Sequence, residues 1–412
     1  MSLSSRNGNG AGAQWTCALL ICGCALLLTL PARAQQLSFV PSVQATAEYD
    51  TNRLLSQTKR GGEWYEAQFA ADLMRETVRS TFEVLPQIAV QESSFKSLNR
   101  LEAQLGMRGE YRSQKTDYKG IASYHREDAY NTEYGLVQFD PLNPGAPDTV
   151  GTGAVVTGIT RQSWTVGPNI THNFTQRFSG ELDANYNAVR YSTEIPQTLV
   201  SFDSPYVELD ALWALSQLSA VGVGPFYSSY NPVNGRENGA LVSQSYGAVF
   251  TYRYRTAQTA NFSIDLKVGK DEQNQFDGSR TSVTAWGVEW RGSQQWLTSR
   301  LQYSVGRFLE PSSVGGEVGL YQIRAQYTRS FGPRFSGLLA TRLTRTSRLG
   351  NSSAGNRDRS YGEASVQYAL TREWSLQGGL RYGWQKLSPA ASAVHNEGVF
   401  ITVGFHGLNP HR

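Results

Sequence analysis

Three runs in the C-terminal part of the chain alternate strictly between apolar and polar side chains: Tyr361–Leu370, Leu376–Trp384 and Gly398–Phe405. The final run puts one apolar set on one side and Phe400, Thr402 and Gly404 on the other; the apolar set is Val399, Ile401, Val403 and Phe405. Only a tight turn, Thr371 to Trp374, separates the run that ends at Leu370 from the run that begins at Leu376. A period of two predicts β-strands, because successive side chains point to opposite faces of a sheet. Since this unit recurs along the chain, we predict an all-β fold, a transmembrane antiparallel β-barrel.

Short polar turns and longer loops alternate between these strands. Short turns are expected near Arg75–Val78, Arg112–Lys115, Thr175–Arg177, Ser216–Gln217, Thr256–Gln258, Gly292–Gln295, Gly332–Arg334 and Thr371–Glu373. Longer loops are expected near Glu92–Leu98, Ala129–Thr160, Ser192–Ser204, Asn231–Gly239, Asp271–Gly278, Pro311–Gly316, Gly350–Arg359 and Leu387–Asn396. Outer-membrane barrels have tight periplasmic turns and longer external loops. The segments between connections number ~18, with about 16 as the alternative. The first strand is expected at Gln36–Glu48, and the last strand should close the barrel by pairing with it near Leu37 to Ala47.

Aromatic residues bracket several of the predicted short turns. The pairs are Phe174 with Phe178, Trp290 with Trp296, and Phe331 with Phe335. Amphipathic rings favour the lipid headgroup level, so these pairs predict a periplasmic aromatic girdle. The competing interpretation is a soluble β-sandwich whose core they would cap, but alternating segments of roughly ten residues that recur this often favour the barrel.

The mean hydropathy of −0.40 is low for a membrane protein. It is compatible with a water-filled barrel, in which half of the strand residues face water. Beyond the N-terminus no apolar run is long enough for a spanning helix.

The N-terminus has the pattern of a secretory signal peptide. Arg6 precedes an apolar run from Cys17 to Leu30, and Ala32-Arg33-Ala34 is a small-x-small cleavage site. We therefore expect a signal peptide at residues 1–34 and the barrel at residues 35–412, with lipid attachment at Cys22 or Cys24 as the alternative. The three cysteines all lie before the cleavage site, so the mature chain would contain none. Loss of Arg6 and Arg33 leaves 36 basic against 34 acidic residues, a balance that gives no basis for nucleic-acid binding.

Motifs for catalysis or cofactor binding are scarce. The five histidines show no metal-ligand spacing such as H-E-x-x-H, and no glycine-rich phosphate loop is present. His125, followed by Arg126, Glu127 and Asp128 near an external strand end, could serve a surface protease or lipase. No second partner is fixed, and a lone loop histidine is usually a solvated residue. We expect no enzyme activity, no cofactor and no metal.

The segment from Leu136 to Thr160 lacks a strand pattern and is rich in Pro and Gly. Long structureless loops are either functional or disordered. Two interpretations stay open: a constriction folded into the lumen, or an external loop.

Charged side chains alternate with the apolar stripe on many strands and so should face the lumen. The pore-lining candidates are Arg253, Arg300, Arg324, Arg342, Arg381, Asp183, Asp265 and Glu363, with Glu181 and Glu289 on the same side. Rings of charge choose the cargo of a channel, whereas cross-strand ion pairs in a solvated lumen contribute little. The excess of arginine in the C-terminal half favours an anionic solute.

Residues Val40-Pro41 and the segment Glu48-Tyr49-Asp50-Thr51-Asn52 resemble the opening of the β-barrel porins found among bacterial exopolysaccharide secretion genes. That family has a Tyr-Asp-x-Asn segment at the end of its first strand; here Thr51 replaces the commoner acidic residue, and His406–Arg412 follow the last aromatic residue. The resemblance extends over the whole chain as architecture. It implies a passive channel in the outer membrane of a Gram-negative bacterium. Its expected partners are outer-membrane lipid, an anionic polysaccharide and periplasmic export machinery. The alternatives are a surface-exposed barrel enzyme and a plugged structural or adhesive barrel.

Overall fold

The computed structural model describes residues 36–408 apart from 54, 56–58, 97–98, 130–157, 196–198, 234–241, 257–258, 275–278, 314–315, 349–356 and 388–391. These residues form the strands β1 (Gln36–Asp50), β2 (Gly62–Glu76), β3 (Ser80–Ser93), β4 (Arg100–Arg112), β5 (Thr116–Asp128), β6 (Thr160–Asn173), β7 (Phe178–Tyr191), β8 (Phe202–Ala214), β9 (Ser219–Pro232), β10 (Val242–Arg255), β11 (Ala260–Asn274), β12 (Arg280–Gln295), β13 (Ser299–Ser312), β14 (Gly316–Ser330), β15 (Phe335–Arg348), β16 (Arg357–Ala369), β17 (Trp374–Leu387) and β18 (Val394–His406).

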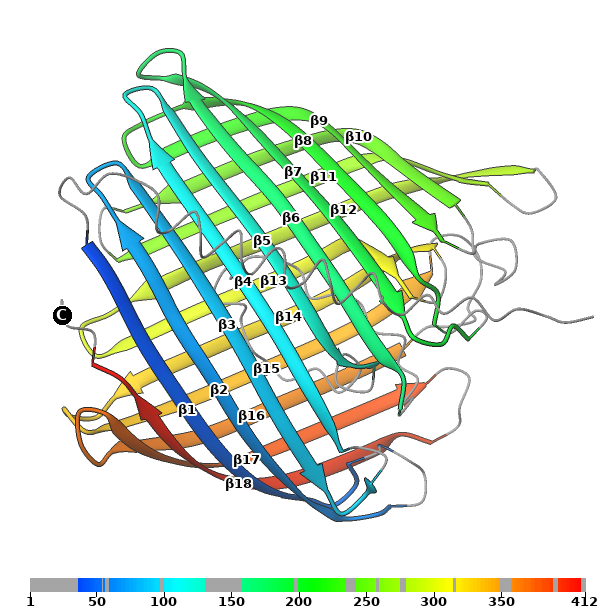
Figure 1. Cartoon of the computed structure of the whole chain (residues 1–412). Coiled ribbons are helices and arrows are strands. Elements are labelled where there is room, and N and C mark those ends of the chain that lie inside the picture. Colours follow the sequence, from blue (N-terminus) through cyan, green and yellow to red (C-terminus); the bar gives the residue numbers. More distant parts are fainter. Residues whose placement is uncertain are drawn as a thin grey trace, which may run out of the picture.

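The described strands make one antiparallel sheet that closes on itself. Each strand pairs with its neighbours in the chain, and β1 pairs with both β2 and β18. Figure 1 shows the resulting barrel, with strands strongly tilted to its axis. Closure gives every strand a paired neighbour on both sides, as a β-structure needs to cross hydrocarbon; the start of β1 and residues Arg280–Gly287 of β12 extend beyond this and pair on one side only. The predicted barrel and its 18 strands are confirmed.

The seam between β1 and β18 runs from Ser42 opposite His406 to Asp50 opposite Gly398. The expected closing pair is confirmed, but the paired stretch of β1 lies further along the chain than Leu37 to Ala47. The reason is the tilt of the strands: the first residues of β1 pair with β2 alone, since β18 ends before it reaches them.

The Tyr49–Asn52 segment holds β1 and β18 together at the long-loop end of this seam. Asp50 and Asn52 are completely buried. The Asp50 carboxylate accepts hydrogen bonds from the Asn52 backbone N–H and from Nδ2 of Asn396, both at 2.7 Å. Thr51 exchanges backbone and side-chain bonds with Glu397 on β18. The segment therefore closes the barrel, a role that its sequence pattern did not indicate.

Short turns gather at one end of the barrel and longer connections at the other, as Figure 1 shows. Both ends of the described chain lie at the short-turn end, as expected for an even number of strands. One predicted turn is wrong. Gly292–Gln295 continues β12, and the turn comes at residues 296–298, where the Trp296 N–H donates to the Ser299 carbonyl at 2.7 Å. Gly292 allows the strand to continue because a Cβ there would lie only 2.7 Å from the Tyr303 hydroxyl.

Several expected loops are shorter than predicted. β8 begins at Phe202 inside the expected Ser192–Ser204 loop, β11 runs to Asn274, and β16 and β18 begin at Arg357 and Val394. Polar residues at these strand ends hide a period-two pattern that backbone pairing nevertheless maintains. The signal peptide predicted at residues 1–34 lies outside the described residues, as does the expected Leu136–Thr160 loop up to residue 157.

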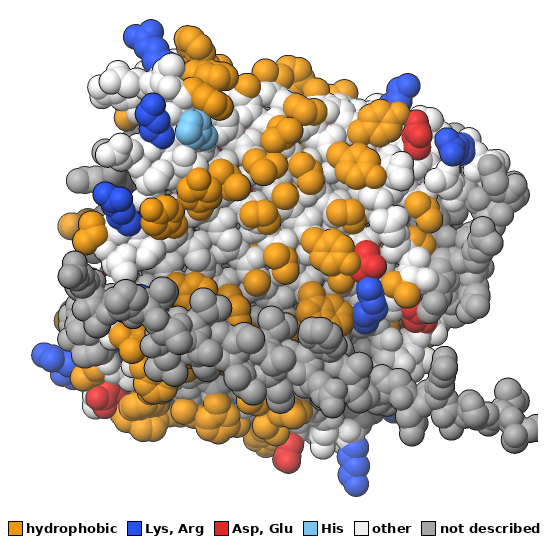
Figure 2. All heavy atoms as spheres, turned by 45° about the horizontal axis from the view of Figure 1, so that its top comes forward, with side chains coloured by type: hydrophobic (Ala, Val, Ile, Leu, Met, Phe, Trp, Pro, Cys, Tyr) orange, Lys and Arg blue, Asp and Glu red, His pale blue; other side chains and the backbone are white. Residues whose placement is uncertain are grey.

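Apolar side chains cover the outside of the barrel. On β18, Val399, Ile401 and Val403 are 58%, 51% and 41% exposed. In Figure 2 hydrophobic side chains spread over the visible wall, and most charged ones gather towards its ends. Aromatic pairs flank short turns: the rings of Phe174 and Phe178 are 5.4 Å apart, and those of Phe331 and Phe335 are 5.7 Å apart. A solvent-exposed apolar band with aromatic borders is what lipid covers in a membrane barrel.

Candidate functional site in the barrel interior

The pore-lining candidates all occupy strand positions that alternate with the exposed apolar set. Leu339 and Leu343, for example, are exposed on β15, and Arg342 points to the opposite face. The structure brings Arg253 together with Glu181, and Arg381 together with Glu363. Asp183 is the next inward residue after Glu181 on β7, and Arg300 lies apart from these pairs. The interior therefore contains several distinct environments.

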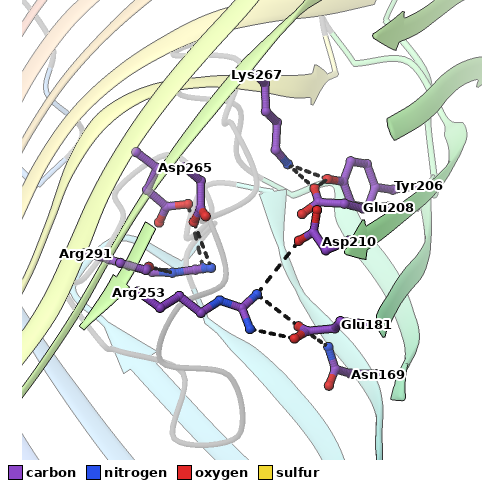
Figure 3. A network of polar contacts seen from close by, with 11 residues as sticks. Asn169, Glu181, Tyr206, Glu208, Asp210, Arg253, Asp265, Lys267 and Arg291 are labelled. Atoms are coloured by element: carbon purple, nitrogen blue, oxygen red, sulfur yellow. Dashed lines mark hydrogen bonds and ion pairs between the residues drawn. The ribbon is translucent and has the colours of Figure 1, made fainter. Parts of the chain in front are cut away.

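The densest one is a network on β6 to β12, most of which Figure 3 shows, and we call it the ion-pair wall. It comprises Asn169, Glu181, Tyr206, Glu208, Asp210, Arg253, Asp265, Lys267, Glu289 and Arg291. At its centre the Arg253 guanidinium contacts the Glu181 carboxylate at 2.5 Å and Asp210 at 3.9 Å. Nδ2 of Asn169 donates to the other Glu181 oxygen at 3.0 Å. Arg253 on β10 thus reaches across two strands to β7, which is possible only on the concave inner face.

Two more cations extend the ion-pair wall along β11 and β12. Lys267 lies 3.0 Å from Glu208 and also contacts the Tyr206 hydroxyl, which donates to Glu208. Arg291 lies 3.2 Å from Asp265 and 3.7 Å from Glu289. Each cation therefore faces carboxylate groups, and the ion-pair wall contains more acidic than basic side chains. Fixed opposite charges of this kind neutralise one another in large part.

Glycines on β9 make this reach possible. Gly222 and Gly224 occupy successive inward positions between the acids of β8 and Arg253 on β10. A Cβ on Gly224 would collide with the Leu209 carbonyl and lie 3.0 Å from Asp210 Oδ1, and one on Gly222 would meet Leu212 at 2.5 Å. A strand without side chains there leaves the gap that Arg253 crosses.

A second ion-pair group joins β1, β16 and β17. The Arg381 guanidinium contacts Glu48 and lies 3.1 Å from Glu363, and it stacks 4.1 Å from the Phe400 ring. Arg53 also binds Glu48, at 2.7 Å. Glu48 has a side chain only 1% exposed, so its two arginines compensate a buried charge.

The other arginine candidates differ from these. Arg324 and Arg342 stand directly opposite each other on β14 and β15, and each makes further polar contacts. Arg300 lies at the short-turn end of β13, exposed and opposite Thr328. On β7, Asp183 is exposed and stands directly opposite Glu208, so two acids are neighbours there.

The long-loop end of the lumen is narrowed by the tip of the β13–β14 hairpin. Glu317 near the start of β14 accepts hydrogen bonds from Ser228 on β9 at 2.8 Å and Ser245 on β10 at 2.5 Å. The Ser313 carbonyl accepts from the Val200 N–H at 2.9 Å. Because β9 and β14 are five strands apart in the sheet, the tip must bend inward to make these contacts. Gly316, with φ of +138°, provides the backbone conformation at the bend.

The residues considered for catalysis are engaged in structural contacts. Glu127 binds Arg161 at 2.6 Å, and Asp128 lies 3.9 Å from Arg100. His125 points from β5 with both acids tied to arginines on neighbouring strands. Among the described residues there is no group of three or more His, Cys, Asp and Glu residues arranged to hold a metal ion.

Sequence reasoning missed Glu208, Asp210 and Arg291 as members of the interior set. The alternation could have identified the two acids, because Val207-Glu208-Leu209-Asp210-Ala211 alternates between apolar and acidic side chains in the same way as the other predicted strands. The sequence also did not indicate the inward bend of the β13–β14 tip, because only contacts between distant strands reveal that bend.

Comparisons with known proteins gave similarity in structure only. No protein-family model and no curated protein sequence matches this chain. Solved structures similar to it include OccK5 (OpdH) of Pseudomonas aeruginosa, with 8% identity and a TM-score of 0.43 over 91% of this chain and 98% of that one. OccK2 (OpdF) of the same organism has 8% sequence identity and a TM-score of 0.47 over 91% of this chain and 99% of that one. A BenF-like porin from Pseudomonas fluorescens Pf-5 has 9% identity and a TM-score of 0.45 over 90% of this chain and 98% of that one.

The architecture itself locates the protein. A closed antiparallel barrel of 18 strands, with an apolar outer band and a charged interior, belongs in an outer membrane of a Gram-negative bacterium. Within the described part of the chain, no helix has the length and hydrophobicity for a membrane crossing.

Proposed function

We propose that this protein is a porin-like channel that lets small hydrophilic solutes diffuse across the outer membrane, and that it is not an enzyme. One observation carries the proposal: the inner face of the closed barrel is lined by charged and amide side chains. Barrels of 16 to 18 strands are wide enough to enclose water. Such a lining favours a hydrated passage over an apolar one.

The bent β13–β14 tip gives the channel a narrow external mouth. Its anchors are hydrogen bonds from Ser228 and Ser245 to Glu317, and Phe308, Val318 and Leu320 form a buried apolar cluster on the adjoining ends of β13 and β14. A solute must pass this tip before it reaches the ion-pair wall. The tip therefore sets the size limit in our proposal.

Single-channel recording in planar bilayers tests the proposal. We expect discrete ohmic current steps for the native protein. Replacing Glu317 with Ala should release the tip and raise the unitary conductance, whereas replacing the outward-facing Glu272 with Ala should not. A protein that inserts and remains folded but carries no current would refute the channel and favour the plugged structural barrel.

Export of an exopolysaccharide is the narrower cargo proposal, and it rests on the Tyr49–Asn52 resemblance. Buried Asp50 and Asn52 in that segment serve barrel closure, so its presence supports a shared fold more than a shared cargo. A strain that lacks the protein should accumulate polymer in the periplasm if the cargo is correct. Unchanged secretion of polymer would remove this narrower proposal and leave the channel untouched.

A further inference from the structure

A polar cavity opens into the lumen at the short-turn end of β13 to β17. Its volume is about 510 Å³. We call it the Arg300 pocket and define it by the inward side chains Arg300, Thr328, Ser336, Ser365, Gln367 and Gln377. This volume lies in the range that small-molecule sites occupy.

The charge of this pocket differs from that of the ion-pair wall and of the group around Glu48. None of the described residues that line it is Asp or Glu. Within the described part of the chain, the Arg300 guanidinium has neither an ion-pair nor a hydrogen-bond partner. Its five N–H donors are therefore available to a ligand.

Most of the other lining groups are hydroxyls and amides, and Leu297, Arg329, Gly337 and Leu338 complete the lining. The hydroxyls and amides come from successive strands: Thr328 stands opposite Arg300, and Gln367 stands opposite Gln377 and Ser336. Side-chain amides and hydroxyls can each both donate and accept hydrogen bonds, so they match a ligand with many hydroxyl groups. Within the pocket, Gln377 donates to the Ser365 hydroxyl at 3.0 Å, which orients the amide without using its oxygen.

We propose that the Arg300 pocket is a periplasmic-side binding site for a hydroxylated carboxylate, a sugar acid. The inference rests on the proposed channel function and names the solute class that the channel would hold on its way through. Arginine binds a carboxylate through two parallel N–H···O bonds, and the hydroxyl and amide groups would contact the sugar ring. A site at the periplasmic mouth retains the solute after the narrow external mouth and the ion-pair wall have been passed.

Current blockade by glucuronate tests the proposal. With native protein in a planar bilayer, we expect glucuronate on the short-turn side to cause blockades that last longer than those caused by glucose. The substitution Arg300→Gln should shorten the glucuronate dwell time by about tenfold, the effect of losing one charge-assisted contact.

Arg255→Gln is the matched control. Arg255 is an exposed inward arginine at the last position of β10, next to a short turn and outside the pocket. It should leave the dwell time unchanged if the pocket, and not general positive charge at the mouth, holds the ligand. Equal shortening by both substitutions, no effect of Arg300→Gln, or equal dwell times for glucose and glucuronate would each overturn the site.

The same recordings separate this inference from the channel itself. Steady current without sugar in the native protein and both variants establishes an open, folded channel. Absence of that current refutes the proposed function, whereas current without Arg300-dependent blockade refutes only the sugar-acid site.

Discussion

The ion-pair wall and the Arg300 pocket are neighbours on the inner face, yet their arginines are in opposite situations. Arg253 has Glu181 and Asp210 within ion-pair distance, whereas the described lining of the pocket around Arg300 is mostly hydroxyl and amide groups and contains no acid. Both were predicted to line the pore by the same alternation. The comparison teaches that an inward arginine can be a structural cation or a binding group, depending on whether acids from other strands reach it.

The physical basis of the difference is the supply of carboxylates. Strands β7 and β8 place Glu181, Asp183, Glu208 and Asp210 on the inner face, whereas the described lining of the Arg300 pocket contains no acid. Buried carboxylates need a nearby cation, and removal of one partner leaves an uncompensated charge. The wall should therefore contribute to stability and the pocket to selectivity.

The largest expected effect is a loss of barrel stability when a charge is placed on the lipid-facing side of a strand. Both interior regions depend on the barrel being folded. Ile401→Arg should destabilise the barrel by about 2–4 kcal/mol, because Ile401 lies near the middle of β18 on the lipid face. Val403→Arg should cost less than that, since Val403 is closer to the short-turn end. Urea unfolding in lipid vesicles measures both.

The inward-facing Thr402→Arg is the control for this first experiment. Thr402 shares a hydrogen bond of 2.9 Å with Thr46 inside the barrel. A cost as large as that of Ile401→Arg would mean that the two faces of β18 have been assigned the wrong way round.

Removing the acids of the ion-pair wall comes next. The double substitution Glu181→Ala and Asp210→Ala leaves Arg253 without its carboxylates and should cost about 2–3 kcal/mol. The value is kept below that of a fully buried pair because the Arg253 side chain is 36% exposed. Ser365→Ala with Gln367→Ala, in the Arg300 pocket, should cost less than about 1 kcal/mol. Equal losses in the same unfolding assay would erase the contrast between the regions.

Single arginine substitutions give a smaller version of the same contrast. Arg253→Gln should cost about 1–2 kcal/mol, since the Asp210 side chain, 2% exposed, loses a cation that water replaces poorly. Arg300→Gln should change stability by less than about 0.5 kcal/mol. Refolding yields and unfolding midpoints of the two variants measure the difference, and a larger cost for Arg300→Gln would reverse our assignment.

The smallest effect is on ion selectivity. We expect a modest anion preference in the native channel, from reversal potentials under a salt gradient, which weakens as salt rises because screening shortens the reach of each charge. Arg300→Gln should reduce this anion preference. Arg345→Gln should not, because Arg345 faces outward and is paired with Asp358. A native preference for cations would show that inward acids such as Asp183 and Asp265 dominate.

The sequence predicted which face of a strand each side chain occupies better than it predicted where strands end and which side chains meet. Val399, Ile401 and Val403 are outside, and Arg253, Asp265 and Glu363 are on the opposite face, because alternation is a property of each strand alone. The turn expected at Gly292–Gln295 was wrong because a polar, glycine-containing run also fits inside a strand where Tyr303 approaches closely.

Alternation along single strands determined the architecture of this protein: a closed antiparallel barrel follows from repeated period-two segments joined by alternating short and long connections. The tertiary structure alone decided which charges meet. Arg253 and Glu181 are 72 residues apart, and their contact depends on the curvature of the wall and on the missing side chains of Gly222 and Gly224. The closing register at Asp50 and the inward bend at Gly316 are likewise set by distant strands. Register and curvature are collective properties of the whole sheet, so no local pattern specifies them.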